Sequence, residues 1–229
     1  MKILALETSC ELGSVALSVD GETLERRLEG SGAGHSATIL PALHALLAEA
    51  ELHITDLDAI AFGAGPGSFT GVRLGCGIAQ GLALGADKPV AVVSSLLALA
   101  EPVTAAFIYC AADARMQEAY VAMYQRHEDQ LSIVMQPVCM PPGEVPLPSG
   151  KMWCGVGSAF KAYRDAMSMR LGDSVSVLDA EAVPRAVSIA RLAERAQANW
   201  MDPALAAPEY VRNRVALTIA ERLAQGGKA

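Results

Sequence analysis

The sequence has few of the residues and motifs on which catalysis and metal binding usually depend. It contains four histidines, none of which has another histidine three or four residues away, and it lacks the patterns G-x-S-x-G and H-E-x-x-H. A serine hydrolase or a metallopeptidase needs its nucleophile or its metal ligands at such fixed spacings. We therefore expect neither a catalytic residue nor a metal site.

Cysteine and basic residues are also sparse. The five cysteines are scattered and form no C-x-x-C pair, which is typical of reduced thiols rather than of a disulfide framework. The net charge is −7, and a chain without a run of Lys or Arg is by itself a poor binder of nucleic acid. The first apolar stretch ends at Glu7, too early for a signal peptide. We expect a cytoplasmic protein.

Apolar residues are abundant, at 52% of the 229 residues, which is enough for a large core in one long domain or two of ordinary size. The most distinctive stretch covers residues 57–86. It predicts a short strand, a glycine-rich turn and a helix that begins near Ser68 or Thr70. The helix is apolar all round, so we expect it to be buried on every side. Its uncharged run over 74–86 is too short to cross a membrane.

Two stripes of small residues run along roughly opposite faces of this helix. One stripe contains Gly71, Gly75, Ala79 and Ala83, and the other contains Gly77, Gly81 and Gly85. Each glycine costs about 0.8–1 kcal/mol relative to alanine in a helix, so close packing must return that free energy. One face covers a sheet, and the other faces a second domain of this chain or a partner protein. The pattern leaves both alternatives open, and it does not say which stripe faces outward.

The rest of the chain predicts a repeated unit. The first unit consists of strands over 2–6, 14–19 and 22–28, a helix over 36–50, a strand over 57–62, the glycine-rich helix and a strand over 90–93. The second consists of strands over 105–111, 119–125, 131–136, 152–156 and 175–178, with helices over 158–167 and 187–200. Such repetition indicates an internal duplication of an α/β domain. We expect one domain over 1–101 and the other over 102–229.

Two polar loops at matching points of the two units form a candidate ligand site. In one loop lie Glu7, Thr8 and Ser9, and in the other lie Asp113 and Arg115. If the loops face each other across a cleft, their carboxylates and hydroxyls suit a magnesium nucleotide. Asp113 and Arg115 equally suit a local ion pair, and both interpretations stay open.

Five segments, taken in order, resemble the landmarks of the TsaB (YeaZ) family. They are LETSCELGSVALSVDG, HSATILPAL, AIAFGAGPGSFTGVRLGCGIAQGLALG, AADARMQEAYVAMY and PEYVRN. The resemblance covers nearly the whole chain. It implies an actin-like ATPase (ASKHA) fold with two ribonuclease-H-like domains, each a mixed β-sheet flanked by helices. It also implies a role in forming threonylcarbamoyladenosine at position 37 of tRNAs that read ANN codons.

The resemblance further implies a scaffold rather than an enzyme. In that system the TsaB subunit pairs with its paralogue TsaD, which carries the transfer catalysis, while TsaE docks on the pair and TsaC supplies threonylcarbamoyl-adenylate. ATP and magnesium belong to the assembled complex, and tRNA is bound only through it. Where TsaD has two metal-binding histidines this chain has Ser95 and Leu99, and leucine cannot ligate a metal. The alternatives are a peptidase of the M22 glycoprotease type and an independent sugar-kinase-like ATPase.

We expect TsaD to dock on the glycine-rich helix and on the helix over 36–50 beside it. Without TsaD, the same surface would form a homodimer. The expected interface residues are His35, Ile39, Leu43, Gly71, Gly75, Ile78, Ala79, Leu82 and Ala83.

Overall fold

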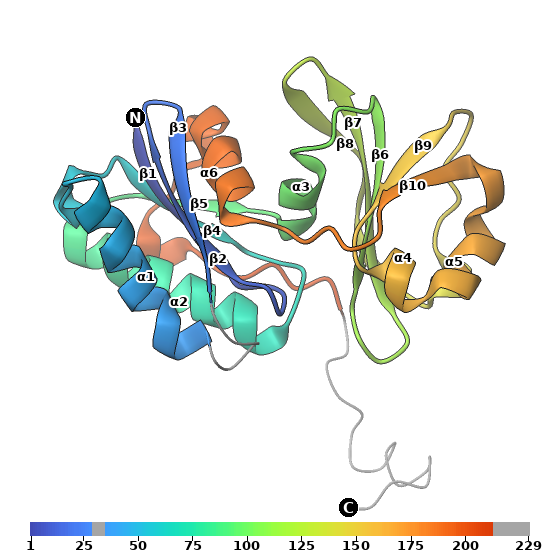
Figure 1. The fold of residues 1–229 in the computed structure, drawn as a ribbon, viewed down its shortest axis with the longest axis horizontal. Helices are drawn as coiled ribbons and strands as arrows, with labels where there is room; N and C mark the ends of the chain where they lie inside the picture. The colour runs from blue at the N-terminus through green and yellow to red at the C-terminus, as the bar shows by residue number, and fades with distance from the viewer. Residues whose placement is uncertain (29–34, 213–229) are drawn as a thin grey trace, which may run out of the picture.

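The computed structural model describes residues 1–28 and 35–212, which form two similar α/β domains side by side (Figure 1). The first sheet contains β1 (Lys2–Glu7), β2 (Ser14–Val19), β3 (Glu22–Arg27), β4 (Ala59–Gly63) and β5 (Val90–Val93). The second contains β6 (Phe107–Asp113), β7 (Ala119–His127), β8 (Gln130–Met140), β9 (Trp153–Val156) and β10 (Val175–Asp179).

The two sheets have the same topology. Their strand orders are β3-β2-β1-β4-β5 and β10-β9-β6-β7-β8, which is one pattern read from opposite ends. In each sheet the first three strands of the unit pair antiparallel, and the fourth and fifth add in parallel. The predicted internal duplication is therefore confirmed.

Helices cover both faces of each sheet (Figure 1). On the first sheet, α1 (His35–Glu49) and α2 (Phe69–Ala86) cover one face, and α6 (Ala186–Arg195) covers the other. On the second sheet, α4 (Ala159–Ala162) and α5 (Arg164–Leu171) cover one face, and α3 (Ser95–Ala100) covers the other. The helix predicted over 158–167 is divided at Tyr163 into α4 and α5.

The alternation of side chains along β1 explains why its sheet needs helices on both faces. Leu4 and Leu6 lie in the core beneath α1 and α2, whereas Ile3 and Ala5 lie in the core beneath α6. Successive side chains of a strand point to opposite faces, and a strand buried on both faces is apolar at nearly every position. The described part of the chain has no helix that is both long enough and apolar enough to cross a bilayer.

The expected boundary between residues 101 and 102 is wrong for the C-terminal part of the chain. Helix α6 returns to the first domain, where Ile189 shares a buried cluster with Ile3, and Met201 forms a bridge to Val90. The physical reason is the small side chains on this face of the first sheet, which let an alanine-rich helix approach closely. They are Ala5, Ala16, Ala61 and Ala91 on the sheet and Ala186, Ala190 and Ala193 on α6.

The first domain thus comprises residues 1–100 together with 186–206, and the second domain lies between these two segments. Helix α3 contributes to both cores, since Ala98 packs beneath the first sheet and Leu96 and Leu99 pack beneath the second. The part of the expected second domain beyond Arg212 lies outside the described residues.

Replacing Ile189 by alanine tests the return of α6. Ile189 is fully buried, so Ile189→Ala should lower the free energy of unfolding by about 2–5 kcal/mol. Leu178→Ala, at an exposed position of β10, is the control and should change it by no more than about 0.5 kcal/mol. Urea denaturation measures both, and equal effects would contradict the assignment of α6 to the first core.

Candidate functional site

Helix α2 begins at the predicted place and lies unusually close to the loop after β1. Ser68 caps the helix, with its Oγ accepting a hydrogen bond from the backbone N–H of Gly71 at 3.4 Å. Thr8 Oγ donates to the carbonyl oxygen of Gly71 at 2.7 Å. A Cβ added at Gly71 would lie 2.0 Å from the Thr8 carbonyl oxygen, and one at Gly75 would lie 2.7 Å from Thr8 Oγ. Gly71 and Gly75 are therefore needed for the close contact between α2 and Thr8.

Most of the expected interface residues lie in the interior, so that prediction needs correction. Gly71, Gly75, Ala79 and Ala83 face the first sheet and the loop after β1 and are buried. His35, Ile39 and Leu43 of α1 are buried as well, and His35 Nε2 lies 3.0 Å from the Glu11 carbonyl oxygen. The first sheet needs an apolar layer over this face, and α1 and α2 provide that layer with side chains such as Ile39, Leu43 and Ala79. Ile78 and Leu82 are half-buried at the edge of the same core.

The other stripe faces outward. Gly77, Gly81 and Gly85 would each accept a Cβ without meeting another atom within 4 Å. The exposed apolar residues nearby are Leu84 of α2, which is 60% exposed, and Leu40 of α1, which is 51% exposed. Because α1 and α2 lie on the same face of the first sheet (Figure 1), we call this surface the outer α1–α2 face.

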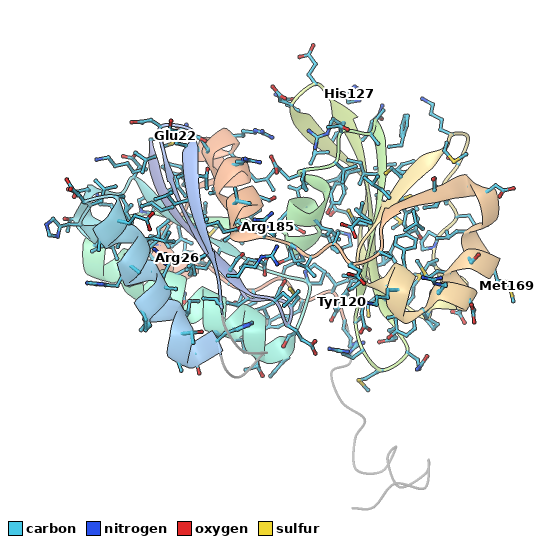
Figure 2. The ribbon with its side chains drawn as sticks, in the orientation of Figure 1. Glu22, Arg26, Tyr120, His127, Met169 and Arg185 are labelled. Atoms are coloured by element: carbon cyan, nitrogen blue, oxygen red, sulfur yellow. The ribbon has the colours of Figure 1, made fainter. Side chains whose placement is uncertain are left out.

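A cleft of about 790 Å³ lies between the two domains. Its walls are the loop after β1, the start of α2, the loop after β6, α4 and residues 209–212. Figure 2 shows Tyr120, one of the lining residues, in the middle of the molecule. Of the five candidate ligand residues, Ser9, Asp113 and Arg115 line the cleft, whereas Glu7 and Thr8 are buried beneath it.

Glu7 is engaged inside the protein. Its Oε1 accepts a hydrogen bond from the Ser9 N–H at 2.6 Å, and its Oε2 accepts one from Ser95 Oγ at 2.8 Å. A Cβ at Gly63 would lie 2.0 Å from Oε2, so the carboxyl group fills the space beside β4. Burial raises the pKa of Glu7, and the hydrogen bonds from Ser9 and Ser95 oppose that rise. This carboxyl group is not placed to hold magnesium in the cleft.

The charges of the second loop are also engaged. Arg115 pairs with Asp113 at 3.2 Å and with Glu11 across the cleft. Asp113 also accepts a hydrogen bond from the Tyr163 hydroxyl at 2.6 Å, and burial together with that bond raises the pKa of Tyr163 to about 12. The structure thus contains the local ion pair between Asp113 and Arg115.

The remaining basic groups of the cleft are paired in the same way, since Lys161 contacts Glu181 at 2.5 Å and Arg212 contacts Glu118 at 2.5 Å. Within residues 1–28 and 35–212, no group of three or more His, Cys, Asp or Glu side chains is placed to hold a metal ion. An actin-like ATPase fold implies a magnesium nucleotide in such a cleft. Among the described residues that line the cleft, Arg115, Lys161 and Arg212 each face a carboxylate, and the carboxyl group of Glu7 is buried beneath it, so none of these side chains is set to hold the phosphates or the metal.

The sequence matches proteins of tRNA modification. Residues 29–220 match the family model TsaD, described as tRNA N6-adenosine threonylcarbamoyltransferase. The tRNA threonylcarbamoyladenosine biosynthesis protein TsaB of Escherichia coli K12 is 38% identical to this chain, and the alignment covers 94% of this chain and 96% of that protein. TsaB of Haemophilus influenzae is 36% identical over 94% of this chain and 95% of its own length. The chain belongs to the TsaB (YeaZ) family.

Solved structures agree with membership of the TsaB family. YeaZ from Pseudomonas aeruginosa has 35% sequence identity and a TM-score of 0.81, over 91% of this chain and 99% of that one. Component A of the Acidaminococcus fermentans (R)-2-hydroxyglutaryl-CoA dehydratase has 10% identity and a TM-score of 0.50, over 86% and 99%. This second likeness concerns the fold alone. The predicted actin-like ATPase fold is confirmed.

Several residues of this TsaB-family chain that shape the site were missing from the sequence-based predictions. Leu40 and Leu84 mark the outer face, and Tyr210 and Arg212 line the cleft. The signal for the last two was the segment PEYVR, an aromatic and a basic residue in a stretch with no other evident role.

The two glycine stripes give a matched pair of alanine substitutions. Gly71→Ala should destabilise the fold by about 1–3 kcal/mol, because the new Cβ collides with the Thr8 carbonyl group. Gly81→Ala should stabilise it by up to about 1 kcal/mol, because the new Cβ meets open space and alanine favours the helix. Thermal or urea denaturation measures both. Two changes of the same sign would contradict the assigned orientation of α2.

The raised pKa of Glu7 predicts a pH dependence of stability. A carboxyl group whose pKa is higher in the folded state than the ordinary 4.5 stabilises the fold fully below that pH, and the stabilisation declines as the pH rises toward the raised value. Between pH 4.5 and the raised pKa, the free energy of unfolding of the wild type should fall by up to about 1.4 kcal/mol per pH unit relative to that of Glu7→Gln. Urea denaturation of both proteins from acid to neutral pH measures the difference. Parallel curves would show that Glu7 is ionised at no extra cost and would contradict the prediction.

Proposed function

We propose that this chain works in the cytoplasm as a non-catalytic scaffold subunit that docks TsaD through the outer α1–α2 face. The assembled proteins would form threonylcarbamoyladenosine at position 37 of tRNAs that read ANN codons. Membership of the TsaB family supports the pathway, since the relatives from Escherichia coli and Haemophilus influenzae are named for threonylcarbamoyladenosine biosynthesis. The five unpaired cysteines suit a reducing compartment.

The outer α1–α2 face is the observation that carries the docking proposal. It offers exposed leucines beside a stripe of glycines where nothing stands within 4 Å of an added Cβ. A second helix can approach such a stripe more closely than an ordinary helix surface, so that backbones and side chains pack densely. The match of residues 29–220 to the TsaD model supports a common fold for the two subunits. Two helices from each would then form a four-helix contact, and two copies of this chain could form a similar contact without TsaD.

The scaffold role is supported by Ser95 and Leu99, which the resemblance sets at the positions of the metal-binding histidines of TsaD. Ser95 is buried, and its hydroxyl donates to Glu7 while accepting from the Gly65 N–H at 3.2 Å. Leu99 is buried in the core beneath the second sheet. The two alternative functions, an M22-type peptidase and an independent sugar-kinase-like ATPase, have less support. A metal-dependent peptidase would need ligands at these positions, and an independent ATPase would need basic groups that are free to bind phosphate.

The other partners follow from the same proposal. TsaE would dock on the pair, TsaC would supply threonylcarbamoyl-adenylate, and ATP and magnesium would be held by the assembled complex. We expect tRNA to be bound mainly by the partners, because this chain has a net charge of −7 and nucleic-acid affinity depends on neutralising phosphates.

Replacing Gly81 by arginine tests the docking face. The side chain has open space in the free chain, so Gly81→Arg should stay folded with an unchanged or higher melting temperature. Burying its charge unpaired in the contact should cost several kcal/mol, enough to abolish micromolar binding of TsaD. Calorimetric titration measures binding, and a reaction reconstituted with TsaD, TsaE, TsaC, ATP and tRNA measures modification, which should also be lost.

Gly143→Arg is the matched control, since Gly143 is equally open but belongs to the second domain. It should bind TsaD and support modification like the wild type. Wild-type affinity in Gly81→Arg would place the docking surface elsewhere. Modification of tRNA by the wild-type chain without TsaD would overturn the scaffold role.

A further inference from the structure

The last described segment of the chain, Pro203–Arg212, is fastened along one flank of α2. Gln80 Nε2 donates to the carbonyl oxygens of Pro203 and Ala206, both at 3.0 Å, and Arg73 Nε donates to the Tyr210 hydroxyl oxygen at 2.8 Å. Arg73 also lies over the ring of Phe69 at 3.4 Å from its centroid. Because residues spaced by three or four share one side of a helix, Arg73 and Gln80 hold this segment along two turns of α2.

Between these two points a third contact, made by Cys76, falls on the same flank. Its Sγ lies 3.7 Å from the Ala206 carbonyl oxygen. Further along, the Glu209 N–H donates to the Ala64 carbonyl oxygen at 2.8 Å, next to the turn that precedes α2. The segment is therefore tied to the first domain from Pro203 as far as Tyr210.

The end of the same segment is tied to the second domain. Arg212 Nη2 donates to the Ala114 carbonyl oxygen at 2.9 Å and pairs with Glu118 at 2.5 Å. Val211 packs against the cluster that contains Tyr120 of β7. Figure 1 shows this red segment running from behind the first domain toward the second domain.

We infer that Pro203–Arg212 is a strut that fixes the orientation of the second domain relative to α2. Its functional meaning rests on the proposed docking role. Because α2 carries the outer α1–α2 face, the strut also sets where the second domain stands with respect to a docked partner. Arg212 is a positioning residue in this arrangement, since it acts through the second domain and lies away from the docking face.

Most other side-chain ties between the domains are exposed or lie where the chain crosses from one domain to the other. Arg195 Nη1 of α6 donates to the Asp129 carbonyl oxygen of the second domain at 3.0 Å, but its side chain is 42% exposed. Glu11 and Arg115 pair across the cleft, but their side chains are 66% and 64% exposed, and exposed pairs contribute little. Glu101 lies 3.7 Å from Arg191 and 3.6 Å from Arg195, at the point where the chain leaves α3. Helix α3 packs in both cores at this crossing, and bending about it is the motion that these contacts leave to the two domains. The Arg212 pair is only 16% and 32% exposed, and it lies on the strut that begins on α2.

The orientation can be measured on the free chain. Two spin labels can be introduced as unnatural residues at the exposed positions Glu22, at the top of the first domain, and Met169, at the outer edge of the second (Figure 2). Double electron–electron resonance then reports the distance between the domains. The wild type should give one narrow distance distribution, and Arg212→Ala should broaden it. Arg26→Ala is the control, because it removes the Arg26–Glu49 ion pair inside the first domain and should leave the distribution narrow.

Two milder variants keep the test valid if Arg212→Ala does not fold. Glu118→Gln removes the charge that faces Arg212, and Tyr210→Phe removes the hydroxyl that accepts from Arg73. Each should broaden the distribution. Distributions as narrow as that of the wild type in all folded variants would overturn the strut.

A second measurement separates the strut from the proposed function. The dissociation constant of Arg212→Ala for TsaD should stay within about twofold of the wild type, as expected for independent sites, while the rate of the reconstituted modification should fall. A modification rate equal to that of the wild type would overturn the functional part of the inference. If the wild-type chain itself failed to bind TsaD, the proposed docking role would be wrong, and the distance distributions of the free chain would still decide whether the strut exists.

Discussion

The close approach of α2 to the loop after β1 is the contact on which the rest of the structure depends. The stripe that begins with Gly71 and Gly75 brings the helix backbone against Thr8, and Gly63 makes room for the carboxyl group of Glu7 on the same loop. A helix held this near to the sheet presents its opposite stripe to the surface. The same placement puts the flank of Arg73 and Gln80 beside the C-terminal segment. The close approach of α2 to the loop after β1 thus determines which side of the helix joins the core, which side forms the outer α1–α2 face and which flank holds the strut.

Much of the fold could be predicted from the sequence, because local patterns determine it. Short apolar runs indicated the strands. Ser68 and Thr70 were the two candidates for the start of α2, and Ser68 is the residue that caps it. The repeated order of elements indicated two related domains. The orientation of α2 could not be predicted in this way. Periodicity shows that two stripes lie on opposite faces, but both stripes consist of small residues, so composition does not say which one meets the sheet.

Long-range packing explains what the sequence did not reveal. The return of α6 depends on four alanines that come from four different strands and meet only in the folded sheet. The two polar loops correctly indicated a cleft. Glu7, however, points into the interior, because its carboxyl group accepts hydrogen bonds from Ser9 and Ser95 there. Arg115 pairs with Asp113 in the same loop and with Glu11 of the first domain. Each case includes a neighbour that is remote in the sequence, namely the four alanines for α6, Ser95 for Glu7 and Glu11 for Arg115.

The return of α6 also has a consequence for the order of folding during synthesis. The strands and helices of the second domain are complete once Asp179 has been made, whereas the first sheet lacks the cover over Ile3 until Ile189 emerges. The domain that is synthesised first is therefore the last to be completed. Contacts between the two ends of a chain are slow to form, and an uncovered apolar sheet face invites association with other chains in the meantime. During synthesis, this face of the first sheet therefore stays exposed for longer than any other part of the core described above.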